Sequence, residues 1–431
     1  MGKCELRKKD IFRIINTEYR TAVGRLAEKE PSKIIQCIYQ EEHRMSTETM
    51  NIKKLPVPKF DPKELDRKPG FIFGRPIETY SYPLNQHDAG VQAMSGNPWW
   101  QMQQAMDTTI FTPHIIPDNI ARGFVFEAET PKYRDQKGGP DMFGIDWEWV
   151  EQVGGSMVRP GKPFLEDIED WYDKVVWPDV DSWDWEGCAK ANNGTYLKPE
   201  NFNQTWFHTG YYERLIALME FENAIMAIFD EDSQEHVHTF FRKLTDLYLD
   251  IFRHIHEYFP DVNAVFFHDD WGSQKETFFS PAVVEEMIVP YMKEITDYLH
   301  SVGIFCELHS CGNNYKQVPN MIKAGWDMWS PQLMNDCYKI YDDFGDKIII
   351  ATYPMNIPEE IQNLRSEQEK GEAFAKLPEE EQRRIAREYV HRVNKIGKPS
   401  SYAFYAAHWQ TPAFKEEVYV ESRKIFSGEI E

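Results

Sequence analysis

Short apolar runs alternate with longer amphipathic stretches along most of the chain. The short runs have the composition of strands, and the longer ones carry apolar residues at helical spacing. Such alternation predicts a parallel sheet whose strands are joined by crossover helices, and a length of 431 residues suits one barrel with insertions as well as two or three domains. Strands are expected near residues 123–127, 205–208, 264–268, 304–309, 347–352 and 401–408.

Two helices have boundaries that the sequence marks clearly. Ser280 is suited to an N-cap, Pro281 to the first helical turn, and Gly303 to the left-handed residue that ends a helix. The residues between them form one apolar stripe, which predicts a single helix lying against the sheet. Thr411 and Pro412 in the same way predict a final helix that ends near Gly428.

The N-terminal part differs from the rest of the chain. Helices are expected over 9–27 and 32–43, followed by a Pro- and Lys-rich stretch over 53–62. We therefore expect a partly helical N-terminal extension over 1–74 and a main domain over 75–431. An aromatic-rich insertion is expected near 140–190, and we interpret it as a packed surface cap rather than a lid over the substrate.

Composition narrows the class of protein. The formal net charge is -22, from 70 acidic and 48 basic residues, so nucleic acid is not an expected partner. No apolar run is long enough to span a bilayer and none resembles a signal peptide, so we expect a cytoplasmic protein without a membrane partner. The six cysteines show no paired spacing, so a functional cysteine is expected to be a ligand. There is no Gly-rich phosphate loop, which disfavours nucleotide chemistry.

The expected strand over 304–309 carries the first candidate site. Alternation places Cys306 on one face and Glu307, His309 and Cys311 on the other, at the strand end where barrel active sites form. A His-x-Cys pair offers two zinc ligands, and a catalytic zinc needs a third, for which His408 at the end of the last strand is the best candidate. The alternative is a buried, hydrogen-bonded histidine beside a reduced cysteine.

A second strand end carries three more ionisable groups in His268-Asp-Asp270. Asp269 and Asp270 are candidates for a general acid or base, for orienting a ligand histidine, or for holding a polar substrate group. The alternative is that they cap the turn into the next helix. His208 at a third strand end is a weaker candidate, for which capping or packing is the simpler interpretation.

Four motifs together resemble the uroporphyrinogen decarboxylase-like superfamily. They are His268-Asp-Asp-Trp-Gly-Ser-Gln274, Ser280-Pro281, His309-Ser-Cys-Gly-Asn313 and Gly139-Pro-Asp-Met-Phe-Gly144. The resemblance implies a (β/α)8 TIM barrel, an α/β fold, over 75–431. Its motifs supply the candidate substrate contacts His268, Trp271, Gln274 and Asn313, to which we add His208.

Corrinoid-dependent methyltransferases of this superfamily carry His-x-Cys and a distant third ligand, usually cysteine, on the last strand. The resemblance thus implies zinc bound by His309 and Cys311, with the third ligand at or near His408. No cysteine follows Cys337, so His408 would replace the usual thiolate, with Glu307 as the fallback ligand. Glu307, Asp269 and Asp270 are the catalytic candidates.

The motif around His268 looks most like that of O-demethylases. Such enzymes take the methyl group of a methoxylated aromatic compound and transfer it to the cobalt of cobalamin carried by a separate corrinoid protein, and a homodimer is a possible assembly.

One alternative is methyl transfer from methylcobalamin to a thiol such as coenzyme M. Another is tetrapyrrole decarboxylation, but the Arg-Gln-Ala-Gly-Arg motif of those enzymes is absent from this acidic chain. A docking module without catalysis is disfavoured by ionisable groups at three strand ends.

Overall fold

The chain divides into two compact units, Met1–Asn51 and Ile52–Glu431. The computed structural model describes residues 50, 52–72, 75–103, 107–133, 135–151, 154–395 and 411–430. The helices expected over 9–27 and 32–43 lie outside the described residues, as do residues 401–408. Every helix and strand formed by the described residues belongs to the second unit.

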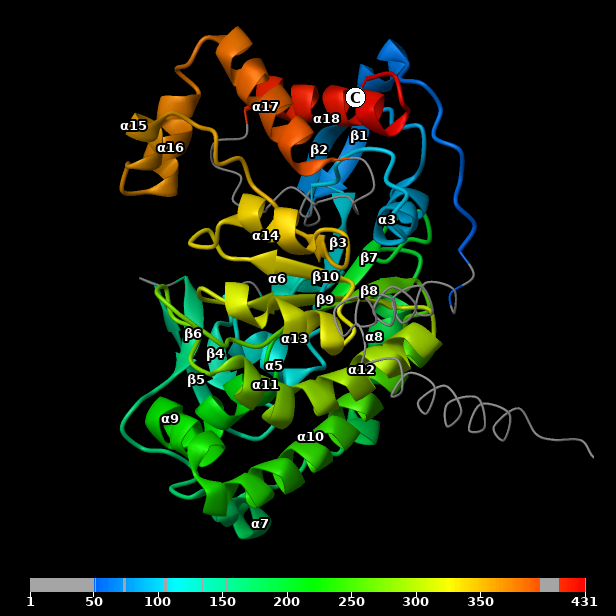
Figure 1. Cartoon of the computed structure of the whole chain (residues 1–431). Coiled ribbons are helices and arrows are strands. Elements are labelled where there is room, and N and C mark those ends of the chain that lie inside the picture. The colour runs from blue at the N-terminus through cyan, green and yellow to red at the C-terminus, as the bar shows by residue number, and fades with distance from the viewer. Residues whose placement is uncertain are drawn as a thin grey trace, which may run out of the picture. The chain divides into compact units, whose positions relative to one another are not determined.

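The second unit is built on a six-stranded sheet with the order β11-β10-β9-β8-β7-β3, in which all neighbouring strands are parallel. In Figure 1 these strands cross the middle of the unit, with α10 and α12 on one side and α17 and α18 on the other. The strands are β3 (Thr109–Phe111), β7 (Asn203–Phe207), β8 (Val262–His268), β9 (Phe305–Ser310), β10 (Met328–Pro331) and β11 (Ile349–Ile350). The prediction of an α/β fold with a parallel sheet is confirmed.

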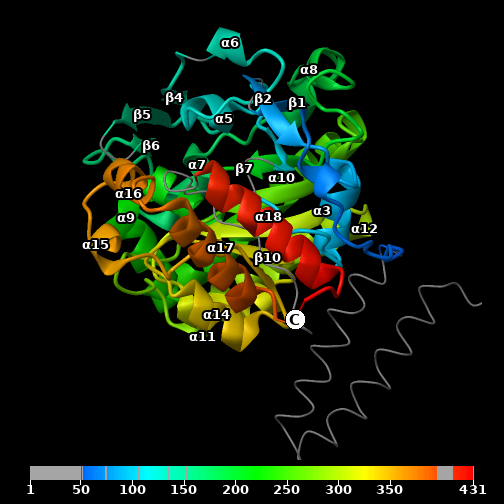
Figure 2. The same cartoon turned by 90° about the horizontal axis from the view of Figure 1, so that it is seen from above.

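Helices connect the strands and form most of the remaining structure. Figure 2 shows α17 and α18 lying side by side. The α-helices are α3 (Gln86–Met94), α5 (Pro117–Ala121), α6 (Thr130–Tyr133), α7 (Trp171–Lys174), α8 (Trp185–Asn192), α9 (Tyr211–Phe229), α10 (Glu231–Tyr258), α11 (Pro281–Met287), α12 (Val289–Ser301), α13 (Val318–Lys323), α14 (Cys337–Phe344), α15 (Glu359–Gln362), α16 (Glu367–Phe374), α17 (Glu379–Val393) and α18 (Pro412–Phe426). Short 3-10 turns are η1 (Pro62–Leu65), η2 (Ile168–Asp170), η3 (Val180–Ser182) and η4 (Tyr315–Gln317).

The two faces of the sheet have different chemistry. On one face Phe267, Cys306 and Leu308 join the large hydrophobic core together with α10 residues such as Tyr248. On the other face the Glu307 carboxylate is buried and accepts hydrogen bonds from Gln204 Nε2 at 2.5 Å and from the Ser330 hydroxyl. The alternation predicted for residues 304–311 is therefore confirmed, and the polar face leads to the strand ends that carry the candidate site.

Two predicted elements differ from the structure. Residues 123–127 form no strand, and Phe126 makes only an isolated antiparallel bridge with Thr112. The helix predicted after Ser280 is divided at Ile288 into α11 and α12, because Pro290 in the first turn of α12 has no N–H to continue the hydrogen bonding of α11. The predicted N-caps are confirmed: Ser280 accepts a hydrogen bond from Val283 N, and Thr411 from Phe414 N.

Two smaller antiparallel sheets accompany the main one. Strands β1 (Arg67–Ile72) and β2 (Arg75–Tyr80) pair in antiparallel fashion. Strands β4 (Gly138–Pro140), β5 (Asp146–Val150) and β6 (Gly155–Val158) lie within the aromatic-rich insertion. Trp147, Trp171 and Trp185 of that insertion are buried. In the described part of the chain, none of the helices has both the length and the hydropathy to cross a bilayer.

Candidate metal centre

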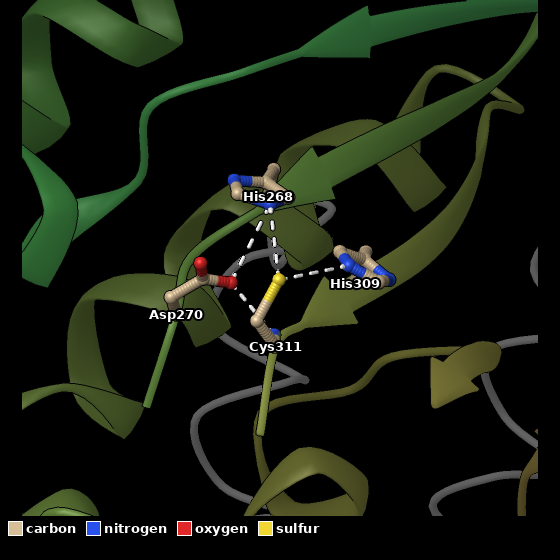
Figure 3. Close-up of side chains that lie close together, drawn as sticks. All are labelled: His268, Asp270, His309 and Cys311. Carbon is tan, nitrogen blue, oxygen red and sulfur yellow. Dashed lines mark hydrogen bonds and ion pairs between the residues drawn. The ribbon is translucent and has the colours of Figure 1, made fainter. Parts of the chain in front are cut away.

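The ends of β8 and β9 bring four potential metal ligands together. In the parallel pairing of these strands His268 lies opposite His309, and Asp270 and Cys311 follow two residues later on the same face. One donor atom of each of the four side chains lies within 4.8 Å of the others. Figure 3 shows the four side chains close together at the ends of the two strands. All four side chains are half-buried, so the group is accessible from solvent.

His309 is held in one orientation by the neighbouring strand. Its Nδ1 donates to the carbonyl oxygen of Ser330 in β10 at 2.8 Å, so Nε2 faces the Cys311 Sγ at 3.4 Å. Burial, with a contribution from His268, lowers the pKa of His309 to about 4. The ring is therefore neutral near pH 7, with a lone pair on the nitrogen that faces the thiol.

His268 is oriented by a carboxylate from another helix. Its Nδ1 lies 2.6 Å from Oε2 of Glu213 in α9, while its Nε2 lies 3.9 Å from Cys311 Sγ and 3.4 Å from Asp270 Oδ1. Burial alone would lower the pKa of His268, but the Glu213 and Asp270 carboxylates outweigh it and raise the pKa well above 6.5. Without a metal this ring is an imidazolium; a cation at Nε2 would take the place of its second proton.

Cys311 and Asp270 lie on the two loops that leave the strands. The Cys311 amide donates to Asp270 Oδ1 at 2.6 Å, and Gln332 Nε2 donates to Cys311 Sγ at 2.9 Å. Burial raises the pKa of the Cys311 thiol to about 11, so a bound cation is required to hold it as thiolate near pH 7. The loops touch at Gly312, whose φ is +93° and where a Cβ would lie 2.2 Å from the Gly272 backbone.

This donor set fits zinc. Two imidazole nitrogens, a thiol sulfur and a carboxylate oxygen are ligands that zinc takes in proteins. Both imidazoles also have the outer partners typical of metal sites, one a carboxylate and the other a backbone carbonyl, which leave Nε2 free for a metal. His268, Asp270, His309 and Cys311 are therefore the residues that could hold a zinc ion.

The other expected catalytic residues lie outside this group. Asp269 is completely buried and accepts hydrogen bonds from Glu213 N and Trp271 Nε1, both at 3.0 Å, so it caps the N-terminus of α9. Its pKa is raised to about 7 by burial. Glu307 is bound to Gln204 and Ser330 below the strand end and is not part of the ligand group. Asp269 thus caps α9, which precedes it in the chain, and not the turn into the helix that follows it.

The expected substrate contacts are spread over different environments. Trp271 is buried beside Asp269, while Gln274 is exposed and Asn313 is half-buried with its amide 3.3 Å from the Lys275 carbonyl. His268 joins the ligand group. The expected third ligand, His408, lies outside the described residues.

The structure places His208 next to His268, although its sequence context made it the weaker candidate. It is buried, its carbonyl oxygen lies 3.2 Å from His268 Nδ1, and its ring stacks on Phe124 with centroids 5.2 Å apart. Its Nε2 has no hydrogen-bond partner within the described residues. Nearby, Phe266 stacks on both Trp206 and His309, so aromatic surface adjoins the ligand group.

Sequence reasoning missed the residues that orient the ligands. Glu213 lies in the first turn of α9 and also pairs with Arg122 at 3.3 Å, and Gln332 follows β10. A strand-end rule could have found Gln332, because it follows a strand of the same sheet. Glu213 gives no such signal, since it looks like an ordinary acidic residue at a helix start.

The comparisons with known proteins agree with a part of this description. The family model described as uroporphyrinogen decarboxylase (URO-D) matches residues 207–351, which run from the end of β7 to β11 and contain all four potential ligands. A solved methyltransferase structure from Methanosarcina mazei is similar at 12% identity with a TM-score of 0.49, over 80% of this chain and 99% of that chain. No curated protein matches. The segment 207–351 is thus similar to the URO-D family, as its motifs suggested.

Proposed function

We propose that this protein is a zinc-dependent methyltransferase that demethylates a methoxylated aromatic compound and transfers the methyl group to the Co(I) centre of a corrinoid protein. The observation that carries the proposal is the convergence of two oriented imidazole Nε2 atoms and one carboxylate oxygen on the Cys311 sulfur. The match of residues 207–351 to the URO-D family is consistent with it.

The proposed zinc ligands are His309, Cys311 and His268, with Asp270 as the fourth donor. Glu213 and the Ser330 carbonyl fix the two rings, and Gln332 supports the sulfur. His408 stays a candidate ligand. We also propose that the parallel sheet belongs to a (β/α)8 barrel over 75–431.

The reaction needs activation of the ether, because an alkoxide or phenoxide leaves poorly. Zinc, when bound, supplies a Lewis acid for the ether oxygen. The C–O bond breaks, the methyl carbon takes the electron pair of Co(I), and the aryl oxygen leaves with the C–O pair and gains one proton. The products are a phenol and a methyl–Co(III) corrinoid on the partner protein, so atoms and electrons balance.

The side chains around the ligands have separate roles in this proposal. The partly exposed Trp206 offers flat surface to the aromatic ring of the substrate, and the neutral His208 can hydrogen-bond a ring substituent through Nε2. The neutral state follows from burial, which lowers the pKa of His208 well below 6.5. The neighbouring Arg122–Glu213 pair keeps Glu213 directed at His268.

The test is a methyl-transfer assay with reduced corrinoid protein, in which loss of the Co(I) absorbance is followed. Methoxyarenes should consume Co(I), whereas methylamines, methyl sulfides and methanol should not. Cys311→Ser should abolish the reaction, and the matched Cys337→Ser control should retain it, because Cys337 is buried in a different core. Full activity of Cys311→Ser or of metal-free protein contradicts the proposal. Reaction only between methylcobalamin and a thiol would support the reverse transfer instead.

A further inference from the structure

A second group of mixed metal-binding side chains lies where the aromatic-rich insertion meets the main sheet. His114 follows β3, Glu127 precedes α6, and Cys188 lies in α8. One donor atom of each lies within 4.8 Å of the others. Three separate segments of the chain therefore converge on one point.

The Glu127 carboxylate at the centre of this group is fully buried. His114 Nδ1 lies 2.5 Å from Oε1, while Cys188 Sγ and Asn192 Nδ2 lie 3.7 Å and 3.5 Å from Oε2. Within the described residues the His114 imidazole is the one basic side chain paired with Glu127. A buried carboxylate is costly without a compensating positive charge, and the thiol and the amide are neutral.

We propose that His114, Glu127 and Cys188 bind a second zinc-type divalent cation, which fastens α8 to the end of β3. Nitrogen, carboxylate oxygen and sulfur are zinc ligands, and oxygen and sulfur bound to one tetrahedral zinc lie about 3.6 Å apart. The Glu127–Cys188 distance of 3.7 Å matches that spacing. The ion replaces the proton between His114 and Glu127, and these two side chains separate by about 1 Å to admit it.

The ion would have both an entry path and a structural effect. The His114 side chain is 24% exposed, whereas those of Glu127 and Cys188 are buried, so the ion enters past the imidazole. The fourth coordination position then faces solvent. The ion adds a crosslink to α8, where Trp185 and Cys188 are buried in the main core. The inference does not depend on the proposed methyl transfer.

The experiment measures zinc per chain by mass spectrometry after incubation with zinc chloride and gel filtration. Cys188→Ser should bind one equivalent less than the matched Cys337→Ser control. His114→Ala, which changes a partly exposed side chain, should show the same loss and serves if Cys188→Ser does not fold. Equal zinc content in both variants and in the control overturns the proposal.

A spectroscopic arm separates this site from the candidate active site. Cys311→Ser protein loaded with Co²⁺ should still show a thiolate-to-cobalt absorption band. The band should be absent from the double variant that also carries Cys188→Ser. No band in the Cys311→Ser protein overturns the second site. If Cys311→Ser leaves the zinc content unchanged while Cys188→Ser lowers it, only the proposed function is contradicted.

Discussion

Glu213 and His268 form a 2.6 Å contact between the first turn of α9 and the end of β8, and this contact points the other imidazole nitrogen, Nε2, at Cys311. Carboxylate partners of this kind strengthen a histidine ligand. Glu213→Gln should weaken zinc binding about 10- to 100-fold, measured by competition with a chelator. Glu294→Gln, which alters an exposed ion pair with Arg242, is the matched control. Equal affinities in the two variants would show that Glu213 does not support the metal.

The loop that carries Cys311 depends on Gly312. Its positive φ and its contact with the Gly272 backbone leave no room for a Cβ. Gly312→Ala should lower both the melting temperature and the zinc affinity. Gly303→Ala is the control, because Gly303 has a similar φ of +81° with open space around it, so it carries only the backbone cost of roughly 1–2 kcal/mol. Equal melting temperatures in the two variants would contradict the steric argument.

His208 provides a test of substrate recognition that is separate from metal binding. His208→Phe keeps a ring but removes Nε2, which has no partner within the described residues. This change should raise KM for a methoxyarene about 5- to 10-fold, which corresponds to the loss of one neutral hydrogen bond. Zinc content should not change. A variant that loses zinc, or one with an unchanged KM, would rule out substrate contact through Nε2.

The buried pair of His300 and Asp327 predicts a pH-dependent stability. His300 Nε2 lies 2.8 Å from Asp327 Oδ2. Burial alone would lower the pKa of His300, but Asp327 and Cys306 outweigh it and raise this pKa to about 11. Between pH 6.5 and 11 the folded chain holds a proton that the unfolded chain releases. The stabilisation is thus complete below pH 6.5 and is lost as the pH rises, by at most about 1.4 kcal/mol per pH unit.

The measurement is the free energy of unfolding in urea between pH 6.5 and 9.5, compared with His300→Gln. The difference between the two proteins should shrink as the pH rises, and the comparison removes titrations that the two share. A difference that stays constant, or one that grows with pH, would contradict the assigned charge of His300.

The sequence predicted the central strands well because apolar and aromatic residues mark each of them between helical stretches. Strands β7, β8 and β9 and helix α18 lie close to their predicted positions. Strand β10 was missed, since Met328–Pro331 is short and ends in proline, and its pairing with β9 and β11 is what makes it a strand. Residues 123–127 have a strand-like composition but only one bridge partner. In both segments the availability of a pairing partner in the folded chain, and not the local composition, determined whether a strand forms.

From the sequence alone, only site residues that lie on the same strand could be placed together. Alternation placed His309 and Cys311 on one face, and the structure agrees. The approach of His268 and Asp270 depends on the register between β8 and β9, which are far apart in the sequence, so neither strand's own pattern reveals it. Glu213 comes from a different helix, so no local pattern could connect it with His268.

Zinc K-edge X-ray absorption on Cys188→Ser protein tests the central claim most directly, because that background lacks the second zinc site proposed above and keeps the site at the ends of β8 and β9. The spectrum should show one sulfur at about 2.3 Å and nitrogen or oxygen ligands at about 2.0–2.1 Å, with two imidazoles among them. Adding His268→Ala should remove one imidazole. A zinc shell without sulfur, or one that His268→Ala leaves unchanged, would contradict a metal centre built from His268, Asp270, His309 and Cys311.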